Sequence, residues 1–261
     1  MKFLIVGDVC GRPGRETFRK YIPQLRKEHN IDVVVVNGEN MAGGRGISRK
    51  TLDEVYAAGA DIVTSGNHIW DQREIASFID DEPFLIRPAN YPEGAPGKGF
   101  CLYPFKAKTI GVINVSGRTF MPPMDCPFQK VDEILKEIKD RCDIILVDIH
   151  AEATSEKIAM GFYLDGKVTC VVGTHTHVQT ADNRLLPKGT AYISDLGMVG
   201  PYNSSLGVNV NNAIDKFITC RPVRFEMASG PNVFSAVVLE VDDKTNKAVS
   251  IERILFNEND V

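Results

Sequence analysis

The chain has 261 residues, of which 43% are hydrophobic and 25% are charged, a composition typical of a globular protein with one hydrophobic core. Its formal net charge of -4 gives no general attraction to nucleic acid or to an anionic membrane, so a bound phosphate would need a local positive centre. We therefore expect a single domain over residues 1–261, without a membrane partner and without stable nucleic-acid binding.

The N-terminal apolar run, residues 2–6, is too short for a signal peptide, and no run approaches the roughly 20 residues of a membrane span. The six cysteines are scattered without a Cys-x-x-Cys pair, which favours reduced thiols over a disulfide framework. These features predict a cytoplasmic protein. They leave open whether the chain forms a homo-oligomer.

The first 80 residues alternate between short β-branched runs and helical patterns, which predicts a βαβαβα layout with a parallel sheet. The expected elements are strand 2–7, helix 14–28, strand 32–37, helix 48–59, strand 61–65 and helix 71–79. Pro13 and Gly14 are expected to open the first helix, and Ser48 and Asp71 are the expected N-caps of the next two.

A segment rich in proline and glycine, residues 88–99, predicts a long loop before the pattern resumes. The later elements are expected at strands 100–105 and 108–115, helix 129–140, strand 143–148, helix 154–164, strands 168–172 and 190–194, and a hairpin of 232–241 with 247–256. The pattern predicts the α/β class, as a layered sandwich with antiparallel strands on its edges.

Five polar motifs follow apolar runs that are predicted to be buried strands. They are Gly7-Asp8, Asn37-Gly38-Glu39-Asn40, Gly66-Asn67-His68, Asp148-Ile149-His150 and Gly173-Thr174-His175-Thr176-His177. Ligands of open α/β sheets bind outside the carboxyl ends of the strands, so distant motifs can meet in one site. Their Asp, Glu, Asn and His side chains, four of them histidines, suit a pair of divalent metal ions, and Glu39 is the expected bridge because a carboxylate can bind both ions.

The motifs resemble those of the calcineurin-like metallophosphoesterases, which carry Asp-x-His, Gly-Asp-x-x-Asp, Gly-Asn-His, a lone His and Gly-His-x-His in this order. The resemblance covers the chain from Asp8 to His177 and implies an α/β/β/α sandwich with mixed sheets. The chain has a narrower resemblance to the YmdB-like branch, the 2′,3′-cyclic-nucleotide 2′-phosphodiesterases. It matches that branch, where the branch differs from the wider family, at residues 7–11, 37–40 and 173–178.

This resemblance implies two metal ions with a shared ligand. It assigns the first ion to Asp8, Glu39, Asn40 and His177, and the second to Glu39, Asn67, His150 and His175. Cys10 stands where the wider family has a histidine, and the amide oxygen of Asn40 is expected to replace that ligand, with the Cys10 thiolate as an alternative. The resemblance favours iron, with manganese as the alternative.

A hydroxide shared by two ions would be available at neutral pH to attack phosphorus. His68 follows Asn67 and is not needed as a ligand, so we expect it to be the general acid, with Asp71 as a candidate to orient its ring. The resemblance implies a small cyclic-nucleotide substrate, opened to a 3′-nucleotide. Two alternatives remain: a phosphomonoesterase or nucleotidase with the same metals, and a regulatory protein that binds nucleotide or RNA and uses the metals structurally.

Overall fold

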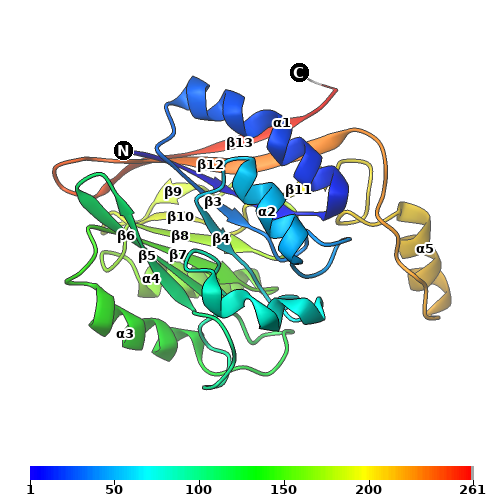
Figure 1. Cartoon of the computed structure of the whole chain (residues 1–261), viewed down its shortest axis with the longest axis horizontal. Coiled ribbons are helices and arrows are strands. Elements are labelled where there is room, and N and C mark those ends of the chain that lie inside the picture. Colours follow the sequence, from blue (N-terminus) through cyan, green and yellow to red (C-terminus); the bar gives the residue numbers. More distant parts are fainter. Residues whose placement is uncertain (260–261) are drawn as a thin grey trace.

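The computed structural model describes residues 1–259 and contains two β-sheets that lie face to face (Figure 1). The first sheet consists of β1 (Lys2–Val6), β2 (Asp8–Val9), β3 (Val33–Asn37), β4 (Ile62–Thr64), β11 (Met198–Pro201), β12 (Asn232–Val241) and β13 (Ala248–Asn257). The second sheet consists of β5 (Phe100–Phe105), β6 (Lys108–Ser116), β7 (Ile144–His150), β8 (Cys170–Thr174), β9 (Arg184–Leu185) and β10 (Ala191–Ile193).

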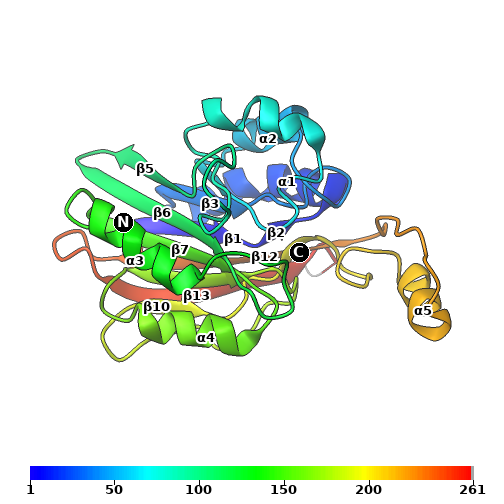
Figure 2. The same ribbon diagram turned by 90° about the horizontal axis from the view of Figure 1, so that it is seen from below.

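Four of the five α-helices within residues 1–259 cover the outer faces of the two sheets. The helices are α1 (Gly11–His29), α2 (Arg49–Ala57), α3 (Pro127–Ile138), α4 (Thr154–Tyr163) and α5 (Val210–Thr219), with short 3-10 helices η1 (Arg73–Ser77) and η2 (Ile79–Asp81). α1 and α2 lie over the first sheet, whereas α3 and α4 lie over the second (Figure 2). These four layers confirm the predicted α/β/β/α sandwich.

Both sheets are mixed. β1, β3 and β4 are parallel neighbours in the first sheet, as are β6, β7, β8 and β10 in the second. The antiparallel strands β5 and β9 lie at the edges of the second sheet, as expected. The C-terminal hairpin meets this expectation in its second strand, because β13 pairs with β12 alone within residues 1–259, but β12 lies inside the first sheet and also pairs with β11 and β1.

Alternation along the strands builds three apolar layers. In β1, Phe3 and Ile5 pack between the sheets, whereas Leu4 packs on the helix side. In β7, Ile144 and Leu146 belong to the same inter-sheet layer. Because side chains alternate with a period of two, the polar residues Asp148 and His150 at the end of β7 must share this inner face. The apolar inter-sheet layer therefore becomes polar at the carboxyl ends of the strands.

Two predicted helix starts are wrong. The first helix begins at Gly11 instead of residue 14, and Pro13 fits its first turn because amide hydrogens there have no partner within the helix. The predicted helix 71–79 is replaced by η1 and η2, and Ile75 in η1 and Phe78 between the two are buried three positions apart. Asp71 is not the N-cap, because that position falls at Gln72.

The sequence patterns missed β9, β11 and α5. α5 stands away from the two sheets in both views (Figures 1 and 2), and Ala213 is its one buried residue. Phe217 and Ile218 on this helix are 80% and 77% exposed.

Homo-oligomer formation stays a prediction. Within residues 1–259, none of the helices has the length and apolar character needed to cross a membrane.

Ser48 caps α2 as predicted. Its hydroxyl accepts a hydrogen bond from the Thr51 amide at 3.2 Å, and the Thr51 hydroxyl accepts one from the Ser48 amide at 3.0 Å. We expect Ser48→Ala to lower the free energy of unfolding by about 1 kcal/mol, measured by urea denaturation. Ser155→Ala in the exposed first turn of α4 is the control, with an expected change below about 0.5 kcal/mol. Equal losses in both variants would contradict the cap.

Candidate metal centre

The predicted ligands meet at the carboxyl ends of the parallel strands. They come from both sheets: Asp8 in β2, Glu39 and Asn40 after β3, Asn67 after β4, His150 at the end of β7, and His175 and His177 after β8. The sheets therefore bring together side chains that are up to 169 positions apart, from residue 8 to residue 177.

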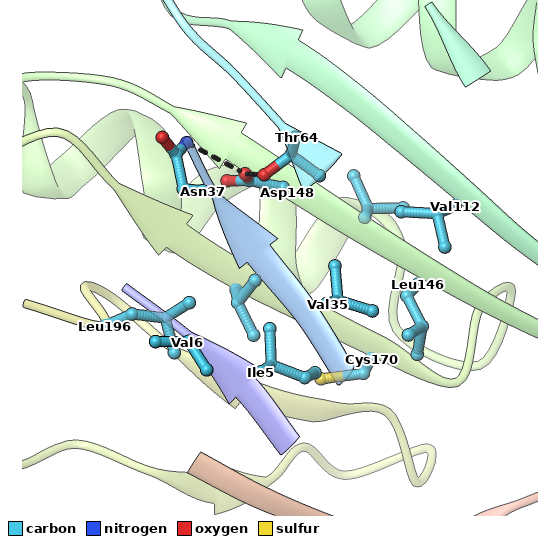
Figure 3. A pocket seen from close by; sticks show the side chains of 12 residues that line it. Ile5, Val6, Val35, Asn37, Thr64, Val112, Leu146, Asp148, Cys170 and Leu196 are labelled. Atoms are coloured by element: carbon cyan, nitrogen blue, oxygen red, sulfur yellow. Dashed lines mark hydrogen bonds between the residues drawn. The ribbon is translucent and has the colours of Figure 1, made fainter. Parts of the chain in front are cut away.

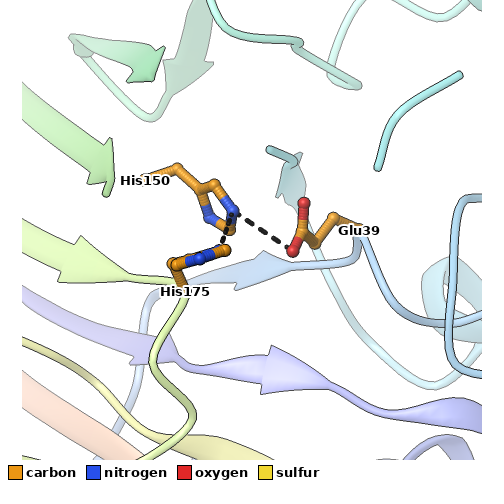
Figure 4. Close-up of side chains that lie close together, drawn as sticks. All are labelled: Glu39, His150 and His175. Carbon is orange, nitrogen blue, oxygen red and sulfur yellow. Dashed lines mark hydrogen bonds and ion pairs between the residues drawn. The ribbon is translucent and has the colours of Figure 1, made fainter. Parts of the chain in front are cut away.

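The first group of donors surrounds the Nε2 atom of His150. This nitrogen lies 3.2 Å from Glu39 Oε1, and Figure 4 shows the two side chains turned toward each other. Asn67 Oδ1 and His175 Nδ1 each lie 3.0 Å from the same nitrogen. Carboxylate, amide and imidazole donors that face a common point suit a divalent cation.

The second group consists of Asp8, Glu39 and His177, whose candidate ligand atoms lie within 4.8 Å of one another. The Oδ1 atom of Asp8 is buried and has no hydrogen-bond partner within residues 1–259. A buried carboxylate oxygen without a partner is costly, and a cation beside it would supply the missing interaction. Glu39 belongs to both groups, as a bridging carboxylate would.

Asn40 lies in the second group but differs in one detail from the expectation. Its amide nitrogen, and not the oxygen, faces the other donors, at 3.0 Å from His177 Nε2 and 3.2 Å from Glu39 Oε1. An amide N–H group satisfies these two acceptors, and a half-turn of the terminal amide would present the oxygen to a cation.

The protonation of the donors follows from their burial and their neighbours. Burial raises the pKa of Asp8 to about 7. Burial acts in the same direction on Glu39, but the adjacent His150 outweighs it, and the pKa of Glu39 falls to about 2. Burial and the adjacent His150 lower the pKa of His175 to about 3, so its imidazole is neutral at neutral pH and has an electron pair to donate.

His68 lies beside the donor groups. Its backbone amide donates to Glu39 Oε2 at 3.1 Å, which places its ring next to the centre. The ring Nδ1 lies 2.9 Å from Asp71 Oδ2, the contact expected from the sequence. The side chain is 25% exposed, whereas that of His150 is fully buried. His68 is the most exposed of the four histidines of this region, since His175 is 20% and His177 13% exposed, and a substrate from solvent can reach it.

A buried ion pair that the sequence patterns missed holds the turn carrying His175 and His177. Both histidines have left-handed backbone angles, with φ of 102° and 64°, which are unfavourable for residues other than glycine. Asp195 accepts hydrogen bonds from the amide and the hydroxyl of Thr176, which lies between them. Lys157 Nζ lies 2.6 Å from Asp195 Oδ2, and both side chains are 1% exposed.

The fold and the site define the class of the protein. The two-sheet α/β sandwich, with Asp, Glu, Asn and His side chains gathered at its strand ends, has the fold and the donor set of the metallophosphoesterases. The family model described as "YmdB-like protein" matches residues 4–254. The chain belongs to this YmdB-like family.

The relatives of the chain match it over nearly its whole length. It is 52% identical to the Bacillus subtilis 2′,3′-cyclic-nucleotide 2′-phosphodiesterase, over 99% of this chain and 98% of that protein. A crystal structure of a hypothetical protein from Thermus thermophilus has a TM-score of 0.94 and 40% identity, covering 99% and 100% of the two chains. The crystal structure of a novel phosphatase from Mycoplasma pneumoniae has a TM-score of 0.94 and 35% identity, covering 98% and 93%.

Gly66 leaves the space in which the first donor group meets. A Cβ atom on this residue would lie 2.3 Å from both Glu39 Oε2 and His150 Nε2. We expect Gly66→Ala to displace both side chains and to weaken divalent-metal binding about 10- to 100-fold, measured by metal analysis after dialysis. Gly94→Ala is the control: its Cβ meets open space, and its φ of 90° strains only an exposed loop outside the donor groups. Normal metal content in Gly66→Ala protein would contradict this geometry.

Lys157→Met would leave Asp195 buried without its cation. We expect this change to lower the free energy of unfolding by about 3–5 kcal/mol, because an uncompensated buried charge is strongly destabilising. Urea denaturation measures the loss. Lys2→Met breaks the half-exposed pair with Glu240, at 3.5 Å, and should cost at most about 1 kcal/mol. Similar losses of unfolding free energy in the two variants would show that the buried pair stabilises the protein no more than the exposed pair does.

Proposed function

We propose that this chain is a metal-dependent phosphodiesterase that hydrolyses 2′,3′-cyclic nucleotides to 3′-nucleotides. The observation that carries the proposal is the position of Glu39, which belongs to two groups of candidate ligands. The substrate class and the choice of the bond that is cleaved are supported by the similarity to the B. subtilis enzyme, which extends over nearly both chains.

The proposed site holds two divalent ions. Asp8, Glu39, Asn40 and His177 would hold the first ion, and Glu39, Asn67, His150 and His175 the second. Nitrogen and oxygen donors suit both iron and manganese, and we propose iron with manganese as the alternative. When bound, such ions lower the pKa of water from about 15.7 to about 7 and so supply a nucleophile at neutral pH.

We propose that His68 donates the proton that the leaving oxygen needs. Asp71 Oδ2 accepts a hydrogen bond from Nδ1 of the ring at 2.9 Å, so Nε2 is the nitrogen that would carry the proton to the substrate. The amide of His68 is bonded to Glu39, which ties the position of the acid to that of the shared ligand. A positioned general acid contributes typically about 10²- to 10⁴-fold in rate.

A phosphomonoesterase activity is the second candidate. It is favoured by the M. pneumoniae relative, which is described as a novel phosphatase. The same donor groups would serve a monoester or a diester, because the metal site would recognise the phosphate and not the base or the ribose of the substrate. Comparing the rates with 2′,3′-cyclic AMP and 4-nitrophenyl phosphate separates the two activities.

We also propose that the chain acts as one cytoplasmic domain on a small-molecule substrate. One inter-sheet core contains residues from Phe3 to Ile251, which supports a single domain. All six cysteines are free thiols, in keeping with a reducing compartment.

The test is chromatography of the products formed from 2′,3′-cyclic AMP by the metal-loaded protein. We expect 3′-AMP. His68→Ala should lower kcat by about 10²- to 10⁴-fold and keep its metal, because the residue acts on the proton and not on the ions. Glu39→Gln should lose both metal and activity, because it weakens both groups.

The control is His29→Ala, since His29 ends α1, a 19-residue helix that starts beside the site at Gly11. This variant should keep the activity of the unchanged protein. Formation of 2′-AMP would reject the proposed regiochemistry while leaving the metal-dependent reaction in place. Hydrolysis of 4-nitrophenyl phosphate alone would reject the diesterase in favour of the monoesterase.

A further inference from the structure

The three histidines of the proposed metal site differ in what their outer ring nitrogens contact. Nε2 of His175 lies 3.2 Å from a carboxylate oxygen of Glu152, and Nδ1 of His177 lies 3.0 Å from the carbonyl oxygen of Leu206. Carbonyl and ionised carboxylate oxygens can only accept hydrogen bonds, so each outer nitrogen carries the proton and the inner nitrogen keeps its electron pair.

His150 has a different partner. Its outer nitrogen, Nδ1, lies 3.0 Å from the hydroxyl of Thr174, and β7 and β8 place these two residues side by side in register. A hydroxyl can donate or accept, so Thr174 alone does not decide which nitrogen of His150 carries the proton. Protonation of Nε2 would direct an N–H group toward Glu39 and Asn67, where a cation needs an electron pair.

Asp148 removes this ambiguity. Its Oδ1 atom lies 2.8 Å from the Thr174 hydroxyl. Its Oδ2 atom accepts hydrogen bonds from the Thr64 hydroxyl at 2.6 Å and the Asn37 amide at 3.3 Å, both of which come from the facing sheet (Figure 3). Three donors therefore converge on this buried carboxyl group, as expected for an ionised carboxylate.

The direction of the hydrogen bonds follows from a count of protons. The Thr174 hydroxyl has one proton, and the bond to Asp148 uses it. Thr174 Oγ1 must then accept the bond from His150, so Nδ1 of His150 carries a proton, and Nε2 is the nitrogen that gives up its proton when a cation binds. We propose that Asp148, acting through Thr174, fixes this tautomer of His150 and thereby keeps Nε2 able to bind a metal ion. The inference rests on the proposed metal site.

The same carboxylate is also linked to the shared ligand. The amide nitrogen of Asn37 donates to Asp148, and its amide oxygen accepts from the backbone N–H of Glu39 at 3.0 Å. Asp148 and Asn37 thus orient both partners of the contact between Glu39 and His150. Asp148 is a positioning residue, since it acts on the proposed ligands through Thr174 and Asn37.

The decisive variant is Asp148→Asn, because it reverses the chain of hydrogen bonds. The new amide N–H group would donate to Thr174, the hydroxyl would then donate to Nδ1 of His150, and the ring proton would move to Nε2. We expect divalent-metal affinity to fall about 10- to 100-fold.

Two threonines provide matched variants. Thr174→Val removes the hydroxyl that connects Asp148 to His150 and should weaken metal binding to a similar extent, whereas Thr174→Ser should restore it. Thr64→Val removes an equally buried hydroxyl bonded to the same carboxylate, but it leaves the connection to His150 intact. Thr64→Val should therefore keep metal affinity near that of the unchanged protein, even if thermal stability falls.

Two results would overturn the inference. One is an unchanged divalent-metal affinity in Asp148→Asn protein. The other is an equal loss of metal affinity in Thr64→Val and Thr174→Val, which would show that only the stability of the buried cluster matters. These readouts do not depend on turnover, so failure of the proposed phosphodiesterase activity would be seen separately, in the product assay.

Discussion

The burial of several electron-pair donors at one end of the inter-sheet layer is the constraint on which the rest of the site depends. Asp8 and Glu39 are almost completely buried, and Oδ1 of Asp8 has no hydrogen-bond partner within residues 1–259. Carboxylates are removed from water at a high free-energy cost unless a positive charge compensates them. Burial lowers the pKa values of His150 and His177, but their acidic neighbours outweigh it and raise both. These imidazoles supply positive charge beside the carboxylates, a role that bound cations would take over.

Supporting interactions behind the donors keep this arrangement in place. The turn after β8 has two non-glycine residues in the left-handed region. Asp195, paired with the buried Lys157, stabilises this turn by accepting a hydrogen bond from the amide of Thr176. The Asp148 carboxylate, at the end of the second sheet, accepts hydrogen bonds from Thr64 and Asn37 of the first sheet. Because these groups are buried and hydrogen-bonded, they hold in place the strand ends that carry the donors.

Much of the architecture could be predicted from the chain itself. Short β-branched runs such as residues 33–36 gave strands close to their observed positions, and Ser48 caps α2 through the capping box that its spacing with Thr51 allows. The segment at 71–79 was harder, since the spacing of Ile75 and Phe78 fits a three-residue period as well as a helical one. β9 and β11 are short, and their partners are distant in sequence, so no local pattern indicated them.

The sequence by itself determined which residue types are available as donors and that strand ends would carry them. The period of two along each strand also determined that Asp148 and His150 would point to the same face. Only the tertiary structure decided that this face meets Asn37 and Thr64 across the inter-sheet layer, and that Lys157 reaches Asp195. Such contacts depend on how two sheets pack against each other, and no spacing along the chain encodes the distance between side chains on facing layers.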